Sequence, residues 1–253
     1  MKRLITLLPF VILTTLFSCE EDPYNDEQYG NHCYISKMET TDGQTTTFSY
    51  DQDDMINSIK TTGGNMPNTE VKFTYNNDMA FADFFLDGTL IGQSEATIDP
   101  NGDVITILFK DSTGSQMGEY TYNYDSNHRV ILIEGYDFVN SEPRAMNIEW
   151  TNGNATRFST DNFIHKCAYK TGKKTSLRIG KGNVFIQAQM ADANIGFFLS
   201  QDVMESYDAS SDLGFILYMS YDFDSDGKVR KMYWSTESTN NFWTTNIDYE
   251  CYD

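Results

Sequence analysis

The sequence is poor in positive charge. Lysine and arginine together number 18 against 37 aspartate and glutamate residues, so the formal net charge is −19. Nucleic-acid phosphates need compensating cations, so we expect no nucleic-acid partner. The same acidity argues against peripheral binding to anionic lipid and favours solubility.

Histidine is also scarce, and this limits the chemistry that the chain can perform. His32, His128 and His165 are scattered, and His165-Lys166-Cys167 alone is too small a set for zinc. The chain lacks a Gly-x-Ser-x-Gly motif and a phosphate-binding glycine loop. We therefore expect no enzyme and no catalytic residues. A hydrolase with paired carboxylates is the remaining catalytic alternative, since 37 acids always include pairs.

Long apolar runs are absent apart from residues 4–17. This run of 14 residues follows Lys2 and Arg3 and is short for a helix that crosses about 30 Å of hydrocarbon. It is typical of a signal peptide, which we assign to residues 1–18. Because residues 1–18 contain two cations and no acids, cleavage would change the net charge from −19 to −21.

The end of this run, Leu16-Phe17-Ser18-Cys19, resembles the lipobox of bacterial lipoproteins. The resemblance implies cleavage before Cys19 and acylation of its side chain. Two or more acyl chains anchor a protein stably, so Cys19 would be the membrane tether. The alternative is an ordinary secretory signal with a coincidental cysteine.

The acidic residues Glu20, Glu21 and Asp22 follow directly and resemble the surface-export signal of Bacteroidetes lipoproteins. The resemblance implies a lipid-anchored outer-membrane protein on the cell surface, with the periplasmic face as the alternative location. Residues 19–31 are polar and lack an apolar period, so we expect a flexible acidic tether.

Cysteine is rare, and three of the four cysteines remain after Cys19. Cys33, Cys167 and Cys251 are an odd number in an oxidising compartment. We expect one disulfide and one buried thiol, with three reduced cysteines as the alternative. A Cys33–Cys251 bond would tie the two ends of the domain together, but the sequence does not choose the pair.

Aromatic and turn-forming residues are abundant, while proline occurs only five times. Tyr124-Asp125-Ser126-Asn127-His128-Arg129-Val130 is a strand–turn–strand motif that returns as 223–229, with weaker copies at 50–53, 75–78 and 98–104. Aspartate or asparagine at the turn entry accepts backbone N–H groups, and glycine or asparagine tolerates positive φ. The turns recur about every 25 residues, which predicts one hairpin per repeat.

We therefore predict a single all-β domain over residues 32–253, with at most one short helix at 200–209. The strands would form an antiparallel meander of β-hairpins, as a strongly twisted, curved sheet or a half-open barrel. The motif resembles the degenerate tyrosine–aspartate hairpin repeats of Bacteroides lipoproteins of unknown function. That family implies no biochemistry.

One copy of the motif also resembles half of a calcium-binding loop. Asp222, Asp224 and Asp226 alternate before Gly227, as calcium ligands do, but Tyr233 stands where a bidentate acid is needed. The competing interpretation is that these residues are turn formers. We expect no cofactor, with calcium as the open possibility.

Two further features suggest binding surfaces. Trp150, Trp234 and Trp243 are candidates for a sugar-stacking face, or else they are core. Six cations lie within residues 166–181, as a docking site for an acidic partner or glycan, or as protection of an edge strand.

The function that we expect is a non-catalytic surface lipoprotein that acts as a binding module for a protein or glycan. The alternative is a glycan-binding accessory protein of a polysaccharide-uptake system. Neither the ligand nor the oligomeric state follows from the sequence.

Overall fold

The computed structural model describes residues 32–76, 78–174, 202–211, 213–236 and 239–252, which form strands and turns without a helix. The sixteen strands in chain order are β1 (His32–Thr40), β2 (Gln44–Tyr50), β3 (Ile56–Gly63), β4 (Thr69–Asn76), β5 (Met79–Leu86), β6 (Thr89–Ile98), β7 (Val104–Asp111), β8 (Gln116–Tyr124), β9 (Val130–Asp137), β10 (Glu142–Thr151), β11 (Asn154–Ser159), β12 (Ile164–Lys174), β13 (Asp202–Asp208), β14 (Ile216–Phe223), β15 (Val229–Thr236) and β16 (Thr239–Tyr252).

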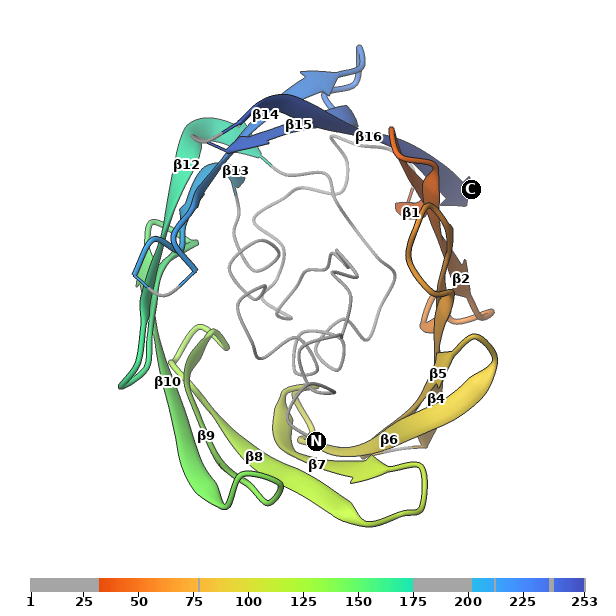
Figure 1. The fold of residues 1–253 in the computed structure, drawn as a ribbon, viewed down its shortest axis with the longest axis vertical. Coiled ribbons are helices and arrows are strands. Elements are labelled where there is room, and N and C mark those ends of the chain that lie inside the picture. Colours follow the sequence, from red (N-terminus) through yellow and green to blue (C-terminus); the bar gives the residue numbers. More distant parts are fainter. Residues whose placement is uncertain (1–31, 77, 175–201, 212, 237–238, 253) are drawn as a thin grey trace.

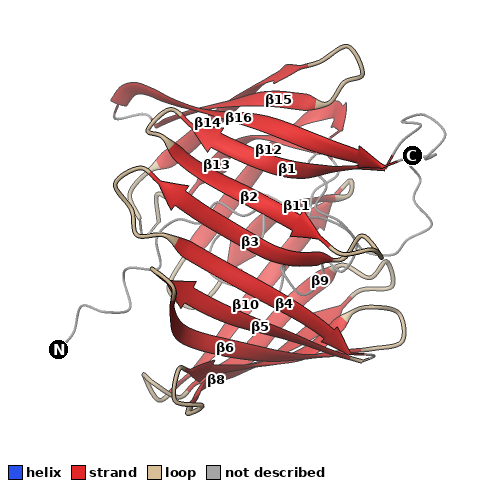
Figure 2. Ribbon diagram, turned by 90° about the vertical axis from the view of Figure 1, so that its right-hand side faces the viewer, coloured by secondary structure: helices blue, strands red, loops and turns tan. Residues whose placement is uncertain are grey.

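The strands form a closed barrel. Each strand pairs antiparallel with the next one in the chain, and β1 pairs with β16. Figure 1 looks into this ring, and Figure 2 shows the strands crossing its wall obliquely. The prediction of an all-β, antiparallel meander of hairpins is confirmed, and the closing pair completes the barrel. Closure gives each of these sixteen strands a partner on both sides, so none of them is left as an open edge.

The short helix predicted at residues 200–209 is wrong over the residues that the structure describes. Asp202–Asp208 is strand β13, which pairs with β12 on one side and β14 on the other. Its Val203, Met204 and Tyr207 side chains are buried. An isolated helix of this length is marginal in water, so ladder hydrogen bonds and burial between two strands prevail.

The inner face of the barrel is apolar. Buried apolar side chains from all sixteen strands belong to one cluster. The outside of a closed barrel faces solvent, so buried side chains that come from every strand must point to the inside. Full burial of one such side chain contributes roughly 1.5–3 kcal/mol to stability, so this cluster drives the folding of the wall.

The outer face carries charged side chains on strands β3 to β15, with apolar residues such as Phe81 and Phe85 between them. Along β10, for example, Met146 and Ile148 are buried while Asn147 and Glu149 beside them are exposed, as the two-residue period of a strand requires. The charged side chains of the outer face include Lys60, Glu70, Lys72, Asp83, Glu95, Lys110, Glu119, Glu134, Glu149, Arg157, Lys166, Glu205, Asp222 and Lys231.

Five turns use an aspartate in the same way, and we call them Asp turns; they begin at Asp51, Asp99, Asp111, Asp125 and Asp224. In each, the carboxylate Oδ1 accepts the backbone N–H groups two and four residues later, at 2.8–3.1 Å. The residue three positions later has a positive φ and is Asp54, Gly102, Gly114, His128 or Gly227. The sequence motifs at 124–130 and 223–229 are thus built by turn chemistry.

A ring of side-chain hydrogen bonds surrounds the barrel where neighbouring hairpins separate. The Tyr124 hydroxyl, for example, donates to the Val104 carbonyl at 2.9 Å, two residues beyond Thr106, where the β7–β8 ladder ends. Seven such caps, at 2.6–3.0 Å, are donated by Tyr50, Tyr75, Tyr124, Trp150, Tyr169, Tyr221 and Tyr249. The eighth pair of strands in this series, β5 and β6, has no such cap. These two strands remain paired to their ends, and Ile98 occupies the position of the donor.

The β16–β1 pair has the register of a hairpin, although the two strands come from opposite ends of the domain. Tyr249 lies opposite Ile35 and an irregularity follows, as at Tyr124–Val130 and Tyr50–Ile56. In those hairpins an Asp turn comes next. Here a disulfide joins Cys33 to Cys251, which lie opposite each other two residues further on. The disulfide therefore occupies the place of a turn.

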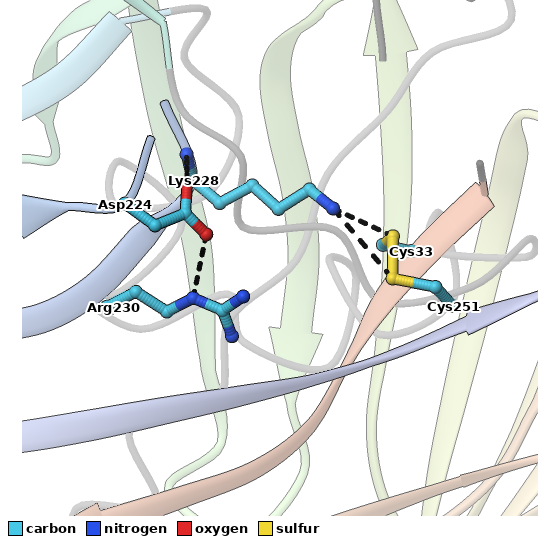
Figure 3. The surroundings of a disulfide bond; sticks show 5 residues. All are labelled: Cys33, Asp224, Lys228, Arg230 and Cys251. Carbon is cyan, nitrogen blue, oxygen red and sulfur yellow. Dashed lines mark hydrogen bonds and ion pairs between the residues drawn. A yellow bond between two sulfur atoms is a disulfide. The ribbon is translucent and has the colours of Figure 1, made fainter. Parts of the chain in front are cut away.

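The surroundings of the disulfide come from the neighbouring hairpin, as Figure 3 shows. The Lys228 Nζ lies 2.9 Å from Cys33 Sγ and 3.8 Å from Cys251 Sγ. Asp224 accepts the Lys228 backbone N–H and the Arg230 Nε–H, each at 2.8–2.9 Å. The Asp turn of β14–β15 thus holds a lysine over the closing bond.

Candidate functional site

A row of four charges crosses the outer face of neighbouring strands β10 to β13. Glu149 lies opposite Arg157, Arg157 opposite Lys166, and Lys166 opposite Asp208. The inner neighbours Phe158, His165 and Cys167 are buried, so strand alternation sends Arg157 and Lys166 outward. The row reads negative, positive, positive, negative.

The two cations in the middle of the row face each other across the β11–β12 ladder. Like charges directly opposite on a sheet destabilise it. Each cation has a carboxylate on its far side instead. Arg157 Nη1 donates to Glu149 Oε1 at 2.8 Å, and the charge of Lys166 is among the causes that lower the pKa of Asp208.

The cations line an open hollow, which we call the cationic hollow. Its volume is about 450 Å³, and its walls are Arg157, Ile164, Lys166, Asp208, Ser210 and Ser211. The Ser211 hydroxyl donates to the Ile164 carbonyl at 2.9 Å and accepts the Ile164 N–H at 3.1 Å. This clamp ties the β13–β14 connection to the start of β12, so the rim is held across 47 residues of sequence.

The chemistry of the hollow favours binding over catalysis. Hydrogen bonds from Ser210 lower the pKa of Asp208, although burial opposes this, and the Lys166 and His165 charges lower it further. An aspartate that is already ionised is a weak general base at neutral pH. His165 faces the inside, where its Nδ1 lies 2.6 Å from the Tyr207 hydroxyl and its ring stacks on Phe163.

Sequence reasoning found part of this site. Four of the six cations of the stretch 166–181 fall within β12, namely Lys166, Lys170, Lys173 and Lys174, while Arg178 and Lys181 fall outside the described residues. The contributions of Arg157, Glu149 and Asp208 were missed. Strand alternation would have sent Arg157 outward, but its position opposite Lys166 depends on the register between β11 and β12.

The three tryptophans do not form a solvent-exposed stacking face. Trp234 is buried and its Nε1–H donates to Thr245 Oγ1 at 3.2 Å. Trp150 is one of the seven caps and lies under the Arg129 guanidinium. Trp243, across from Trp234, is 44% exposed. The structure therefore leaves one of the three in a position to stack on a sugar from solvent.

The calcium candidates are engaged in other contacts. Asp222 accepts a hydrogen bond from the Tyr233 hydroxyl, and the Asp224 carboxylate accepts three N–H groups. Burial raises the pKa of Asp224, but those hydrogen bonds outweigh it and lower the pKa overall. Within the described ranges, no three histidine, cysteine or acidic side chains gather around a possible ion.

Cys19 lies outside the described residues, so its lipidation stays a prediction. Cys167 is free and buried, and burial raises its pKa to about 12, which makes the thiol unreactive. No helix in the described part of the chain is long and apolar enough to cross a membrane.

No protein-family model and no curated protein matches the chain. Among solved structures, it is similar to a porin-like protein from Bacteroides uniformis ATCC 8492, at 17% identity and a TM-score of 0.58, over 85% of this chain and 96% of that one. A porin-like protein from Bacteroides vulgatus ATCC 8482 aligns at 13% identity and a TM-score of 0.42, over 87% and 99%. The first likeness shows a shared fold.

Proposed function

We propose that this protein is a non-catalytic, lipid-anchored binding module of a bacterial outer membrane, and that its barrel stands in water beside the bilayer. The observation that carries this proposal is the distribution of side chains between the two faces of the wall. The inside is apolar and the outside is charged.

A barrel that crosses a membrane has the opposite arrangement. Its outer face carries an apolar band about 25 Å tall, and an arginine or lysine at mid-membrane costs roughly 2–4 kcal/mol. Here charged side chains stand on the outside of strands from β3 to β15, and Lys110 and Arg157 form outer-face ion pairs with Glu95 and Glu149. The similar protein from Bacteroides uniformis is described as porin-like, which would imply a pore, but the outer face of this barrel does not suit lipid.

The membrane link is then Cys19. The run 4–17, the lipobox resemblance and the acidic residues after Cys19 support an acylated, surface-displayed protein. The charged outer face would keep the barrel soluble at a crowded surface.

The test compares the full chain with its Cys19→Ala variant in a Bacteroides host. We expect the wild-type protein in the outer-membrane fraction, labelled by an alkyne fatty acid and degraded by protease added to intact cells. Cys19→Ala should move to the soluble fraction without label. Cys167→Ala, which changes a buried cysteine of the barrel, is the control and should stay in the membrane. A Cys19→Ala protein that resists carbonate extraction from membranes would overturn the proposal, because the barrel itself would then be inserted.

The second candidate function is the glycan-binding accessory protein of a polysaccharide-uptake system. The observation that favours it is the cationic hollow, which is open to solvent and combines two cations, two serines and Ile164. The tryptophans contribute less to this candidate, since Trp150 and Trp234 use their indole N–H groups within the barrel.

A further inference from the structure

We infer that the cationic hollow binds one oxyanion group, a carboxylate or a sulfate, carried by an acidic polysaccharide. This inference rests on the proposed binding function and names the ligand class. It does not depend on the membrane anchor.

The hollow leaves cationic donors unused. Glu149 Oε1 accepts a hydrogen bond from an N–H group of Arg157 Nη1. A guanidinium has five N–H donors in all. Among the described residues, the buried Arg157 Nε–H finds no acceptor. The Arg157 side chain is 38% exposed, so a ligand oxygen in the hollow can accept hydrogen bonds from the guanidinium N–H groups that Glu149 does not use.

Two positive charges also lie opposite each other in the hollow. Arg157 and Lys166 lie directly opposite each other, in a chain whose net charge is −19 and whose outer face offers many carboxylates. An anion placed between the two cations converts their repulsion into two attractions. The repulsion between the two neighbouring cations is thus relieved when an anion lies between them.

The surroundings of the two cations limit the charge of the ligand. Glu149 and Asp208 stand at the two ends of the row, one beside each cation, so the hollow can accept little further negative charge. A singly charged carboxylate or sulfate group therefore fits better than a dianionic phosphate group.

The walls of the hollow suit a sugar that carries such a group. Ser210 and Ser211 supply hydroxyl groups beside the cations, and Ile164, 39% exposed, supplies an apolar surface for sugar C–H groups. The volume of about 450 Å³ lies in the range of small-molecule sites, roughly 300–1,000 Å³. One acidic sugar unit of a longer polysaccharide is therefore the ligand that the hollow fits.

The experiment measures binding of the full-length lipidated protein in detergent micelles by calorimetry. A salt concentration of about 0.15 M screens the global charge beyond about 8 Å. The probes are polygalacturonate, which carries carboxylates, dextran sulfate, which carries sulfates, neutral dextran and galactan, and polyglutamate as an acidic polypeptide. We expect one of the two acidic polysaccharides to bind, and the arm that responds identifies the group.

The variant is Arg157→Gln/Lys166→Gln, which removes both cations from an exposed surface. We expect a loss of affinity of roughly tenfold or more for each cation. The matched control is Arg144→Gln/Lys72→Gln, which removes the same two charges from other exposed positions and should bind like the wild-type protein. Lys166→Arg, which keeps the charge, should retain binding.

Three results would overturn the inference. These are equal binding by the wild-type protein and the Arg157→Gln/Lys166→Gln variant, binding of polyglutamate in preference to both acidic polysaccharides, and no binding of either polysaccharide. If a neutral glycan binds equally to the wild-type protein and the double variant, the anion site is wrong while the binding function stands.

Discussion

The aromatic caps show how single residues finish a closed sheet. Where two neighbouring hairpins separate, one strand keeps a carbonyl that its neighbour no longer reaches. A tyrosine three residues past the last ladder pair supplies the missing donor, as Tyr124 does for Val104. Burial raises the pKa of Tyr75, Tyr124 and Tyr221, so these hydroxyls stay protonated and keep donating.

Tyr124→Phe tests this role. The variant keeps the ring but leaves the Val104 carbonyl without its side-chain donor, so we expect the unfolding free energy to fall by about 1–3 kcal/mol. The measurement is a urea titration followed by tryptophan fluorescence.

Tyr136→Phe is the matched control for that variant. Tyr136 is 40% exposed, so loss of its hydroxyl should leave the midpoint within experimental error. Equal midpoints for the two variants would show that the caps do not contribute to stability.

At the scale of elements, the hairpin depends on the carboxylate of its Asp turn. Asp125 accepts the N–H groups of Asn127 and Arg129, and its Oδ2 accepts from the Arg129 guanidinium at 2.6 and 2.8 Å. Burial raises the pKa of Asp125, but these hydrogen bonds and the Arg129 charge lower it overall. The ionised form therefore stabilises the folded state.

Asp125→Asn tests the charge of the turn across pH. Because the folded pKa lies below the unfolded value of about 3.9, the contribution is present above that value and is lost as pH falls through the folded pKa. We expect Asp125→Asn to be less stable than the wild-type protein at pH 7, and the difference to shrink between about pH 5 and pH 2. Thermal unfolding at a series of pH values measures it.

A control variant is needed because lowering the pH also reduces the charge repulsion among all 37 acidic residues. Asp161→Asn, on an exposed turn, removes the same charge and should show little difference at any pH. A deficit for Asp125→Asn that stays constant down to pH 2 would mean that the charge of Asp125 is unimportant.

For the whole molecule, the decisive feature is closure between β1 and β16. In the Asp-turn hairpins a short turn connects the two strands. In the β16–β1 pair the disulfide joins Cys33 to Cys251, which are 218 residues apart in the sequence. In the chain-entropy description, a cross-link over such a loop stabilises the folded state by up to about 5 kcal/mol. The β16–β1 ladder and the Tyr249 cap then hold the seam along the rest of its length.

Cys33→Ser/Cys251→Ser tests the closing bond. We expect a folded barrel with a lower unfolding midpoint, because the unfolded chain gains conformational freedom while the ladder is retained. Reductant should lower the midpoint of the wild-type protein to the same value and leave the variant unchanged. Cys167→Ala should keep the response to reductant. A wild-type protein that unfolds identically with and without reductant would contradict this role.

Much of the local structure was predictable from the sequence. The motif 124–130 predicts a turn because Asp125 accepts the N–H groups that follow it and His128, three residues later, adopts a positive φ. The resemblance to tyrosine–aspartate repeats remains a prediction, as do the signal peptide and the anchor at Cys19. The helix predicted at residues 200–209 is wrong because the strand character of Asp202–Asp208 comes from the two strands beside it.

Local sequence patterns are enough to specify the features whose interactions are short in range. These are the acidic composition, the alternation that separates an apolar face from a polar one, and the turns closed by their own aspartates. The folded barrel alone sets the features that join residues far apart in the chain. It made the apolar face the inside by pairing β1 with β16, joined Cys33 to Cys251, and placed Arg157 opposite Lys166. The physical reason is that strand register and barrel closure depend on the packing of all sixteen strands together, which no local pattern contains.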